Sequence, residues 1–130
     1  MKVTVLLDSS AWLEYFFGSD KTKDIKSLIE EAKDFIVCTK VNIFEIYHKI
    51  LKERGKEDAE RFTSFILLKS LLDEFDTETI KLAAEEKIKL KLGVADAVIL
   101  STAIKYNATI YTTDSDFKKA KNIVKIVFLK

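Results

Sequence analysis

Short apolar runs alternate along this chain with longer segments in which apolar residues recur every three or four positions. The short runs are rich in β-branched residues, which is typical of strands buried inside a parallel sheet. They lie at residues 3–7, 35–38, 71–75, 109–112 and 123–129. The longer segments have the spacing of helices with one buried face. One begins near residue 10, and the others cover about residues 21–33, 40–55, 57–70, 77–92 and 95–107.

This alternation predicts the fold class. Strands that alternate with helices form a parallel sheet with helices on both faces, so we expect an α/β protein with three α/β/α layers and a five-stranded parallel sheet. No linker or repeat interrupts the pattern, and residues 1–130 are expected to form a single domain. Ligands of such sheets bind outside the carboxyl ends of the strands, so the residues that follow the strands are the first candidates for chemistry.

The composition supports a folded core and argues against several classes of protein. Hydrophobic residues make up 48% of the chain and aromatic residues 11%, which argues against disorder. No apolar run approaches the roughly 18 residues of a membrane span, and the first residues lack the pattern of a signal peptide, so we expect a cytoplasmic protein. One cysteine, Cys38, and one histidine, His48, do not suffice for an internal disulfide or a zinc site. Lys and Glu are abundant and Gln is absent, which resembles the surface of a thermophile protein, although the absence of proline does not.

The charge pattern is more informative than the total charge. The formal net charge is +1, so bulk charge does not attract nucleic acid. Lysines are nevertheless concentrated near the C-terminus, where Lys118 and Lys119 are the candidates for contacts with substrate phosphates. A solvated surface is the alternative explanation of such a run.

Acidic residues fall where the strands end and the helices begin. Asp8 follows the first strand directly, and Asp114 follows the strand at 109–112, with Asp116 two positions later. Asp96 lies at the start of a predicted helix, and Glu45 lies inside a helix among apolar neighbours. Each residue alone also fits a helix cap, a turn or a solvated helix face. Together they predict a cluster of carboxylates at the carboxyl edge of the sheet.

Such a cluster has a defined chemistry. Carboxylates that are brought together repel, and at least one keeps its proton unless a cation offsets the charge. Oxygen ligands without Cys or His suit Mg²⁺ or Mn²⁺ rather than zinc. These ions bind phosphates and lower the pKa of a bound water, which is the equipment for hydrolysis of phosphodiester bonds.

Four short segments resemble the motifs of one known family. They are Val5–Ser10, Asn42–Ile46, Gly93–Ile99 and Thr112–Phe117, in this order and spread over nearly the whole chain. With this spacing the chain resembles the PIN-domain nucleases, especially the VapC-like toxin ribonucleases of VapBC toxin–antitoxin systems. The resemblance implies a PIN-like sheet with a metal site at its carboxyl edge.

The resemblance also implies roles for individual residues. It implies a metal-dependent endoribonuclease whose catalytic residues are Asp8, Glu45, Asp96 and Asp114. The metal ligands would be Asp8, Asp96, Asp114 and Asp116. Residues matching Ser9, Ser10 and Thr112 would orient these ligands by hydrogen bonds, and Asn42, one turn before Glu45, is a further candidate for this task. The family often has Arg or Asn where this chain has Thr113, which removes one possible phosphate contact.

Partners follow from the same resemblance. An RNA substrate and a cognate antitoxin protein are implied, together with a homodimer formed through the helices spanning residues 42–69. The segment 57–70 carries more apolar residues than one buried face requires, which agrees with a partner surface. His48 is expected at the surface or in an interface, and Trp12 in the core or at a partner.

Two other functions compete with a toxin ribonuclease. One is a PIN-domain nuclease of RNA processing or quality control, which would have the same site. The other is a receiver-like metal-binding signalling module with Asp8 as phosphoacceptor. Receiver domains need paired acids after the first strand and an Asp after the third. Here Ser9 and Ser10 follow Asp8, and Asp73 is expected inside the third strand.

Overall fold

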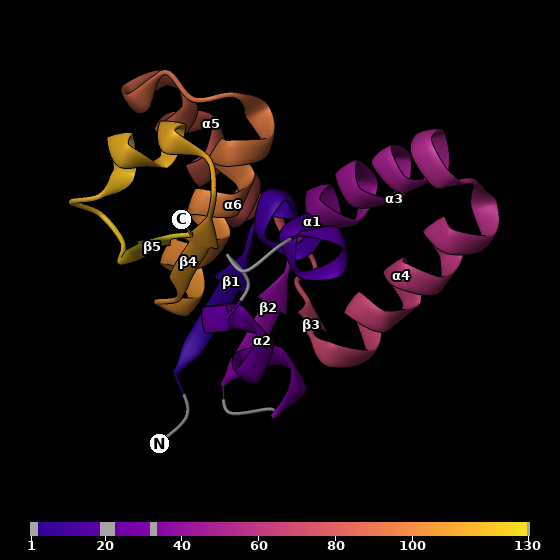
Figure 1. The fold of residues 1–130 in the computed structure, drawn as a ribbon. Coiled ribbons are helices and arrows are strands. Elements are labelled where there is room, and N and C mark those ends of the chain that lie inside the picture. Colours follow the sequence, from indigo (N-terminus) through magenta and orange to yellow (C-terminus); the bar gives the residue numbers. More distant parts are fainter. Residues whose placement is uncertain (1–2, 19–22, 32–33, 130) are drawn as a thin grey trace.

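The computed structural model describes residues 3–18, 23–31 and 34–129 (Figure 1). The strands are β1 (Thr4–Leu7), β2 (Phe35–Cys38), β3 (Leu71–Leu72), β4 (Thr109–Thr112) and β5 (Ile126–Phe128). The helices are α1 (Ser9–Phe17), α2 (Lys23–Glu30), α3 (Lys40–Arg54), α4 (Lys56–Lys69), α5 (Thr77–Leu90), α6 (Val94–Tyr106) and the 3-10 helix η2 (Ser115–Ala120). Each predicted strand and helix is present. The two ends of the helix predicted at 21–33 lie outside the described residues.

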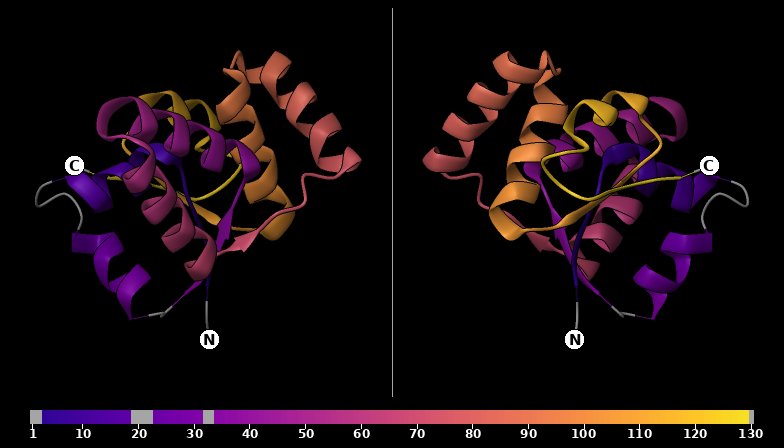
Figure 2. Two further views of the ribbon diagram at one scale, coloured as in Figure 1. Left: turned by 90° about the vertical axis from the view of Figure 1, so that its right-hand side faces the viewer. Right: turned by 90° about the vertical axis from the view of Figure 1, so that its left-hand side faces the viewer.

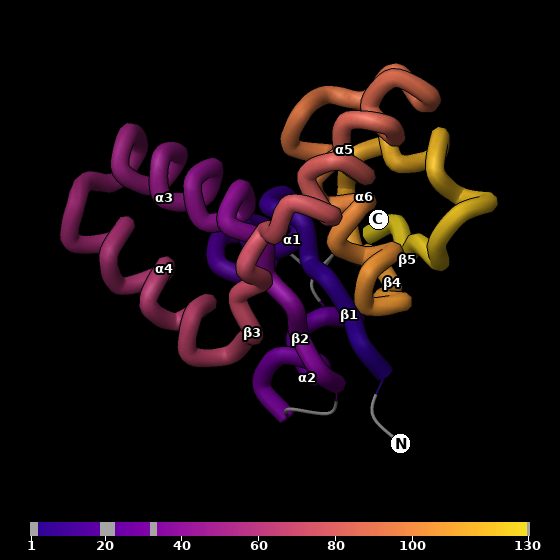
Figure 3. Tube along the Cα trace, turned by 180° about the vertical axis from the view of Figure 1, so that it is seen from behind, coloured from indigo at the N-terminus to yellow at the C-terminus, as the bar shows by residue number. Residues whose placement is uncertain are grey.

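The strands form one parallel sheet in the order β3-β2-β1-β4-β5, which confirms the predicted fold class. Alternate residues of a strand face opposite sides of the sheet. Val5 and Leu7 pack against α1 to α4, whereas Leu6 and Ile110 pack against α5, α6 and η2. Figures 2 and 3 show these two groups of helices on either side of the sheet. Among the described helices, none is long and apolar enough to cross a membrane.

The sequence prediction is wrong at the ends of two strands. β3 stops at Leu72, so Asp73 lies after this strand and not inside it. The Asp73 side chain accepts a hydrogen bond from the Phe75 N–H at 2.9 Å, and Phe75 has a positive φ of 58°, so the backbone turns away from the sheet here. β5 begins at Ile126 rather than 123, and the unpredicted helix η2 takes up residues 115–120.

The carboxyl edge of the sheet brings distant segments together. β1 and β4 are neighbours, and just past the end of β1 the Asp8 N–H donates to the Tyr111 carbonyl oxygen at 3.1 Å. α3 contacts both α1 and α6. The residues that follow β1 and β4 therefore lie close to the first turns of α3 and α6. Trp12 and Cys38 are buried beneath this edge in the layer of α1 to α4, in agreement with their apolar surroundings in the sequence.

Candidate active site

Asp8 is the buried acid at the centre of this edge. It is the N-cap of α1, where its Oδ1 accepts hydrogen bonds from the Ala11 N–H at 2.9 Å and from the Ser10 hydroxyl at 2.7 Å. Its Oδ2 accepts a hydrogen bond from the Thr112 hydroxyl across the β1–β4 junction. Asp8 therefore does cap a helix, as one explanation of its position predicted. The same side chain also lines a groove at this edge, so capping does not exclude a role in chemistry.

Two hydroxyl groups connect Asp8 to the loop after β4. Thr112 Oγ1 accepts a hydrogen bond from the Asp114 N–H at 2.8 Å, and the Thr112 hydroxyl donates one to Asp8. Ser10 Oγ accepts a hydrogen bond from the Thr113 N–H at 3.0 Å, and the Ser10 hydroxyl also donates one to Asp8. Thr112 is completely buried, so its hydrogen bond to Asp8 is shielded from water, whereas the Thr113 N–H bond to Ser10 is exposed. This network fixes the position of Asp8 relative to the backbone that carries Asp114.

Glu45 is directed toward the same edge by α3 and its cap. Thr39 and Asn42 form a reciprocal capping box at the start of α3, which sets where the helix begins. The Asn42 side-chain amide donates to Ser9 Oγ at 3.1 Å, and the Ser9 hydroxyl donates to Glu45 Oε1 at 2.7 Å. Ser9 thereby joins the start of α1 to Glu45, one helical turn along α3.

Three acids come close enough to share one cation. Single carboxylate oxygens of Asp96, Asp114 and Asp116 all lie within 4.8 Å of one another. Asp96 comes from the first turn of α6, Asp114 caps η2, and Asp116 lies in the first turn of η2. Asp8 and Glu45 are not members of this group of three, although both act on it through their charge.

The electrostatics of the edge are those of uncompensated negative charge. Burial and repulsion by Asp114, Asp8, Asp116 and Glu45 raise the pKa of Asp96 to about 6. Burial also raises the pKa of Asp8, against the effect of its hydrogen bonds from Ser10 and Thr112. Within the described ranges no lysine, arginine or histidine forms an ion pair with any of these acids.

A groove of about 690 Å³ opens over this edge. Asp8, Glu45, Asp96 and Asp114 all line it. α3, which carries Glu45, forms one wall of the groove and also contributes Phe44, His48, Lys49, Lys52 and Glu53.

The basic lining of the groove differs from the basic residues singled out in the sequence. Lys118 and Lys119 are not among the lining residues of the groove, and the Lys119 ammonium donates to the Lys91 carbonyl oxygen at 3.1 Å. Lys49 and Lys52 were missed. They follow Glu45 by four and seven residues, which is the spacing of one helix face, and this spacing would have found them.

A family model matches residues 5–123 and describes the PIN domain. The chain belongs to the PIN domain family. This membership confirms the resemblance, supports the prediction of a nuclease and argues against the receiver-like alternative. Among the curated proteins, no match was found.

Solved structures share the fold of this PIN domain at low sequence identity. VapBC2 from Rickettsia felis, bound to a DNA fragment from its promoter, has a TM-score of 0.80 and 19% identity, covering 98% of this chain and 100% of that one. A toxin–antitoxin complex from Klebsiella pneumoniae has a TM-score of 0.74 and 17% identity over 97% and 98% of the two chains. The VapC20 toxin from Mycobacterium tuberculosis, described as cleaving the sarcin-ricin loop, has a TM-score of 0.73 and 15% identity over 89% and 94%. These likenesses show a VapC-like fold.

The donor set of this PIN domain fits a hard divalent cation. The ligand atoms available in the group of three are all carboxylate oxygens, which Mg²⁺ and Mn²⁺ prefer. A cation between Asp96 and Asp114 would relieve the repulsion that raises the pKa of Asp96. Members of the PIN family generally use divalent metal ions, and the acidic cluster agrees with that use.

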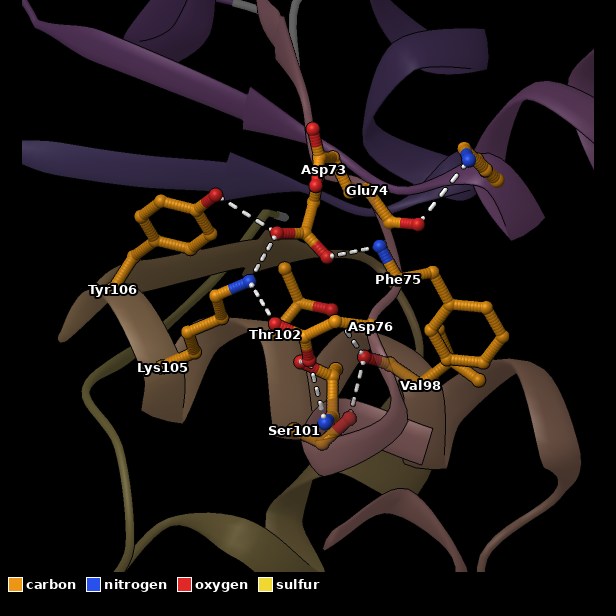
Figure 4. A network of polar contacts seen from close by, with 11 residues as sticks. Asp73, Glu74, Phe75, Asp76, Val98, Ser101, Thr102, Lys105 and Tyr106 are labelled. Atoms are coloured by element: carbon orange, nitrogen blue, oxygen red, sulfur yellow. Dashed lines mark hydrogen bonds and ion pairs between the residues drawn. The ribbon is translucent and has the colours of Figure 1, made fainter. Parts of the chain in front are cut away.

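A second acidic network lies away from the groove and contains its own cation (Figure 4). Asp73 Oδ1 accepts hydrogen bonds from the Lys105 ammonium at 2.9 Å and the Tyr106 hydroxyl at 2.8 Å. Lys105 also lies 3.3 Å from Asp76 Oδ2, and Asp76 caps α5. This network ties the β3–α5 connection to the end of α6, and sequence reasoning did not find it.

Proposed function

We propose that this PIN domain is a Mg²⁺- or Mn²⁺-dependent endoribonuclease that acts as the toxin of a type II toxin–antitoxin pair. The observation that carries the proposal is the convergence of Asp96, Asp114 and Asp116 without an internal cation. A protein gains nothing for its own stability by gathering like charges, so a bound cation is the simplest reason for this arrangement.

The chain's own residues have distinct tasks in this proposal. Asp96, Asp114 and Asp116 would hold the cation together with Asp8, whose Oδ2 accepts one hydrogen bond, from Thr112, and has a further lone pair for a ligand bond. The bound cation supplies an activated water and stabilises charge on the phosphate. Glu45, whose Oε1 is oriented by Ser9, completes the shell or accepts a proton from the attacking water.

Other side chains hold these acids in position. Ser10 and Thr112 donate to the two oxygens of Asp8, and Asn42 holds Ser9 against Glu45. Because each of these contacts is a hydrogen bond to an acid or to its partner, their loss should misplace the carboxylates before it unfolds the domain.

RNA as the substrate and an antitoxin as the partner are supported by the nature of the relatives. The neighbouring structures include toxin–antitoxin complexes and a toxin described as cleaving the sarcin-ricin loop. Residues 1–130 would act as one nuclease domain in the cytoplasm, where it would meet RNA and an antitoxin. A homodimer through the helices spanning 42–69 would cover apolar side chains that are exposed in the single chain: Leu51, Leu67 and Leu68.

The test is cleavage of RNA by the purified protein. Mn²⁺ or Mg²⁺ should support cleavage, and a chelator should abolish it. Asp96→Asn removes one charge and one ligand and should be inactive while remaining folded, whereas the matched control Asp24→Asn, at an exposed position of α2, should be as active as the unmodified protein. Chelator-insensitive cleavage, or full activity of Asp96→Asn, would reject the proposal. Co-purification with a small antitoxin would distinguish the toxin from an RNA-processing nuclease.

A further inference from the structure

One wall of the acidic groove carries an unusual combination of side chains. Phe44 belongs to α3, yet 69% of its surface is exposed. Its ring is stacked on the imidazole of His48 with 6.1 Å between the centroids and an angle of 12° between the planes. Both rings line the groove that contains the acids. A large aromatic side chain exposed to water beside a charged groove costs hydrophobic free energy unless a ligand covers it.

Basic side chains continue the same wall beyond the rings. Lys49 and Lys52 line the groove with Phe44 and His48. Lys49 is paired with Glu53 at 3.1 Å, whereas Lys52 has no ion pair within the described part of the chain. Since Glu45 and Lys52 are seven residues apart, they lie on one face of α3, about 10 Å apart along its axis. The groove thus runs from the acids at the sheet edge to Lys52 and the Lys49–Glu53 pair at the other end.

We propose that this wall of α3 is the binding track for a single-stranded nucleic acid, with one base stacked on Phe44 and a backbone phosphate held by Lys52. Aromatic rings bind bases of any sequence because every base has a flat π-face. A cation beyond the rings neutralises the phosphate that follows the stacked base. This inference rests on the proposed function, because it assigns the way in which the substrate of that site is held.

The charge pattern favours nucleic acid over a second copy of the chain as the occupant. An apolar hollow of about 350 Å³ lies beside the track and is lined by Ile43, Tyr47 and Leu51 in addition to Phe44 and His48. The homodimer proposed above would cover that hollow, whereas Lys52, at the end of the track, has a positive charge that a phosphate matches. A nucleic acid brings bases to the rings and phosphates to Lys52, with the reacting phosphate at the acids.

The experiment separates the contribution of the bases from that of the phosphates. Binding of a fluorescent single-stranded oligoribonucleotide is measured by anisotropy in a chelator, which prevents metal-dependent cleavage, and is compared with an abasic oligomer of the same length and charge. The ratio of the two dissociation constants reports base stacking. Phe44→Ala should reduce this ratio about tenfold, the equivalent of about 1.4 kcal/mol. Phe44→Trp should retain it, and Leu68→Ala, on the exposed face of α4, should leave it unchanged.

Lys52 is tested through its salt dependence. Lys52→Ala should weaken both oligomers equally and reduce the slope of log affinity against log salt by about 0.7. Lys81→Ala, an exposed lysine on α5, is the matched control and should change neither.

Several results would overturn the inference. If Phe44→Ala left the ratio of the two dissociation constants unchanged, no base would be stacked on Phe44. If Phe44→Ala also changed the mass in sedimentation, this wall would be a contact between copies of the chain. Failure of the proposed function gives a different result. If Phe44→Ala reduced the ratio as expected but the protein showed no metal-dependent cleavage, the nuclease proposal would be refuted and the binding track would stand. If the protein cleaved RNA with metal but Phe44→Ala left the ratio unaltered, the nuclease proposal would stand and the binding track would be refuted.

Discussion

Two buried aspartates of this protein have opposite electrostatic surroundings. Asp8 is 4% exposed and Asp73 is 2% exposed, and both follow a strand of the same sheet. Burial would raise the pKa of Asp73, but hydrogen bonds from Lys105 and Tyr106 together lower it. Burial raises the pKa of Asp8, and the charge of Asp114 raises it further. One aspartate has its cation built into the chain, and the other is surrounded by acids.

The difference teaches how a structural acid is distinguished from a candidate ligand. A buried carboxylate is tolerated when a cation and hydrogen bonds satisfy it, as in the network of Asp73. The acids of the groove have hydrogen bonds, but within the described part of the chain no basic side chain forms an ion pair with them. We therefore expect a cation from solution to stabilise the groove, whereas the Asp73 network needs none.

The largest expected effect separates activity from stability. Asp114→Asn should reduce metal-dependent cleavage of RNA about a thousandfold, because it removes a ligand whose electrostatic effect is about 4 kcal/mol. Its free energy of unfolding without metal should change little, since relief of repulsion with Asp96 offsets the weaker cap of η2. Initial cleavage rates and urea unfolding in a chelator measure the two effects.

Asp73→Asn is the matched substitution in the other region. It should leave the cleavage rate within about twofold and destabilise the fold, because the charge that Lys105 neutralises is lost. The contrast would be wrong if Asp73→Asn abolished cleavage without unfolding the protein.

The cation of the Asp73 network should matter for stability. Lys105→Met leaves Asp73 buried beside Asp76 without compensation, and we expect a loss of about 2 kcal/mol in the free energy of unfolding, a value reduced for the partial exposure of Lys105. Urea denaturation measures it. Lys81→Met removes an exposed pair with Glu78 at 4.0 Å and should cost less than about 0.5 kcal/mol, so equal losses in the two variants would contradict this assignment.

The two regions should respond to pH in opposite directions when no metal is present. The pKa of Asp96 is about 6 in the folded protein against an ordinary value of 3.8, so the folded state binds more protons between these values. Stability should therefore fall as the pH rises from about 4 to above 6, by about 2 kcal/mol once the full value of about 3 kcal/mol is reduced for the partial exposure of Asp96. The pKa of Asp76 is lowered to about 2 by hydrogen bonds from Thr79 and Lys105, so its contribution is present above about pH 4 and is lost as the pH falls toward 2.

Asp96→Asn isolates the first of these pH effects. Unfolding free energies measured in a chelator between about pH 3 and pH 7 should show a much smaller decline above pH 4 in this variant. The same decline in the unmodified protein and in Asp96→Asn would mean that another group is responsible.

The smallest expected effect concerns the hydroxyl that connects Asp8 to Asp114. Thr112→Val removes the donor to Asp8 and the acceptor of the Asp114 N–H, and it should cost about 1–2 kcal/mol. Thr112→Ser keeps the hydroxyl and should recover most of the loss in both stability and cleavage. Thermal unfolding and cleavage rates measure it, and a valine variant as stable as the serine variant would remove this hydrogen bond from the account.

The sequence predicted those parts of the candidate site that depend on local rules. Asp8 directly follows β1, Asp114 lies two residues after the end of β4, and Asp96 is in the first turn of α6, so the topology of a parallel sheet suffices to bring them to one edge. The position of Glu45 could not be predicted from such local rules, because the direction of its side chain depends on where α3 begins and on the hydrogen bond from Ser9.

What the sequence did not predict depends on contacts between distant elements. Asp73 meets Lys105 across 32 positions of the chain, and nothing near Asp73 signals that partner. A separate, local hydrogen bond from the Phe75 N–H to Asp73 Oδ2 turns the backbone after Leu72, so the strand predicted at 71–75 was too long. The basic wall of the groove was missed although Lys49 and Lys52 share one helix face with Glu45, and the packing of α3 against α1 and α6 places that face along the groove.

The most direct test of the central claim is the effect of Mn²⁺ on thermal stability. If the acids of the groove are completed by a cation, Mn²⁺ at about 100 times its dissociation constant should add about 2.7 kcal/mol and raise the Tm by about 10 °C. Asp73→Asn should show the same shift, measured from its own lower starting Tm, and Asp96→Asn should show little or none. Equal shifts in Asp96→Asn and the unmodified protein, or no shift in either, would contradict the claim.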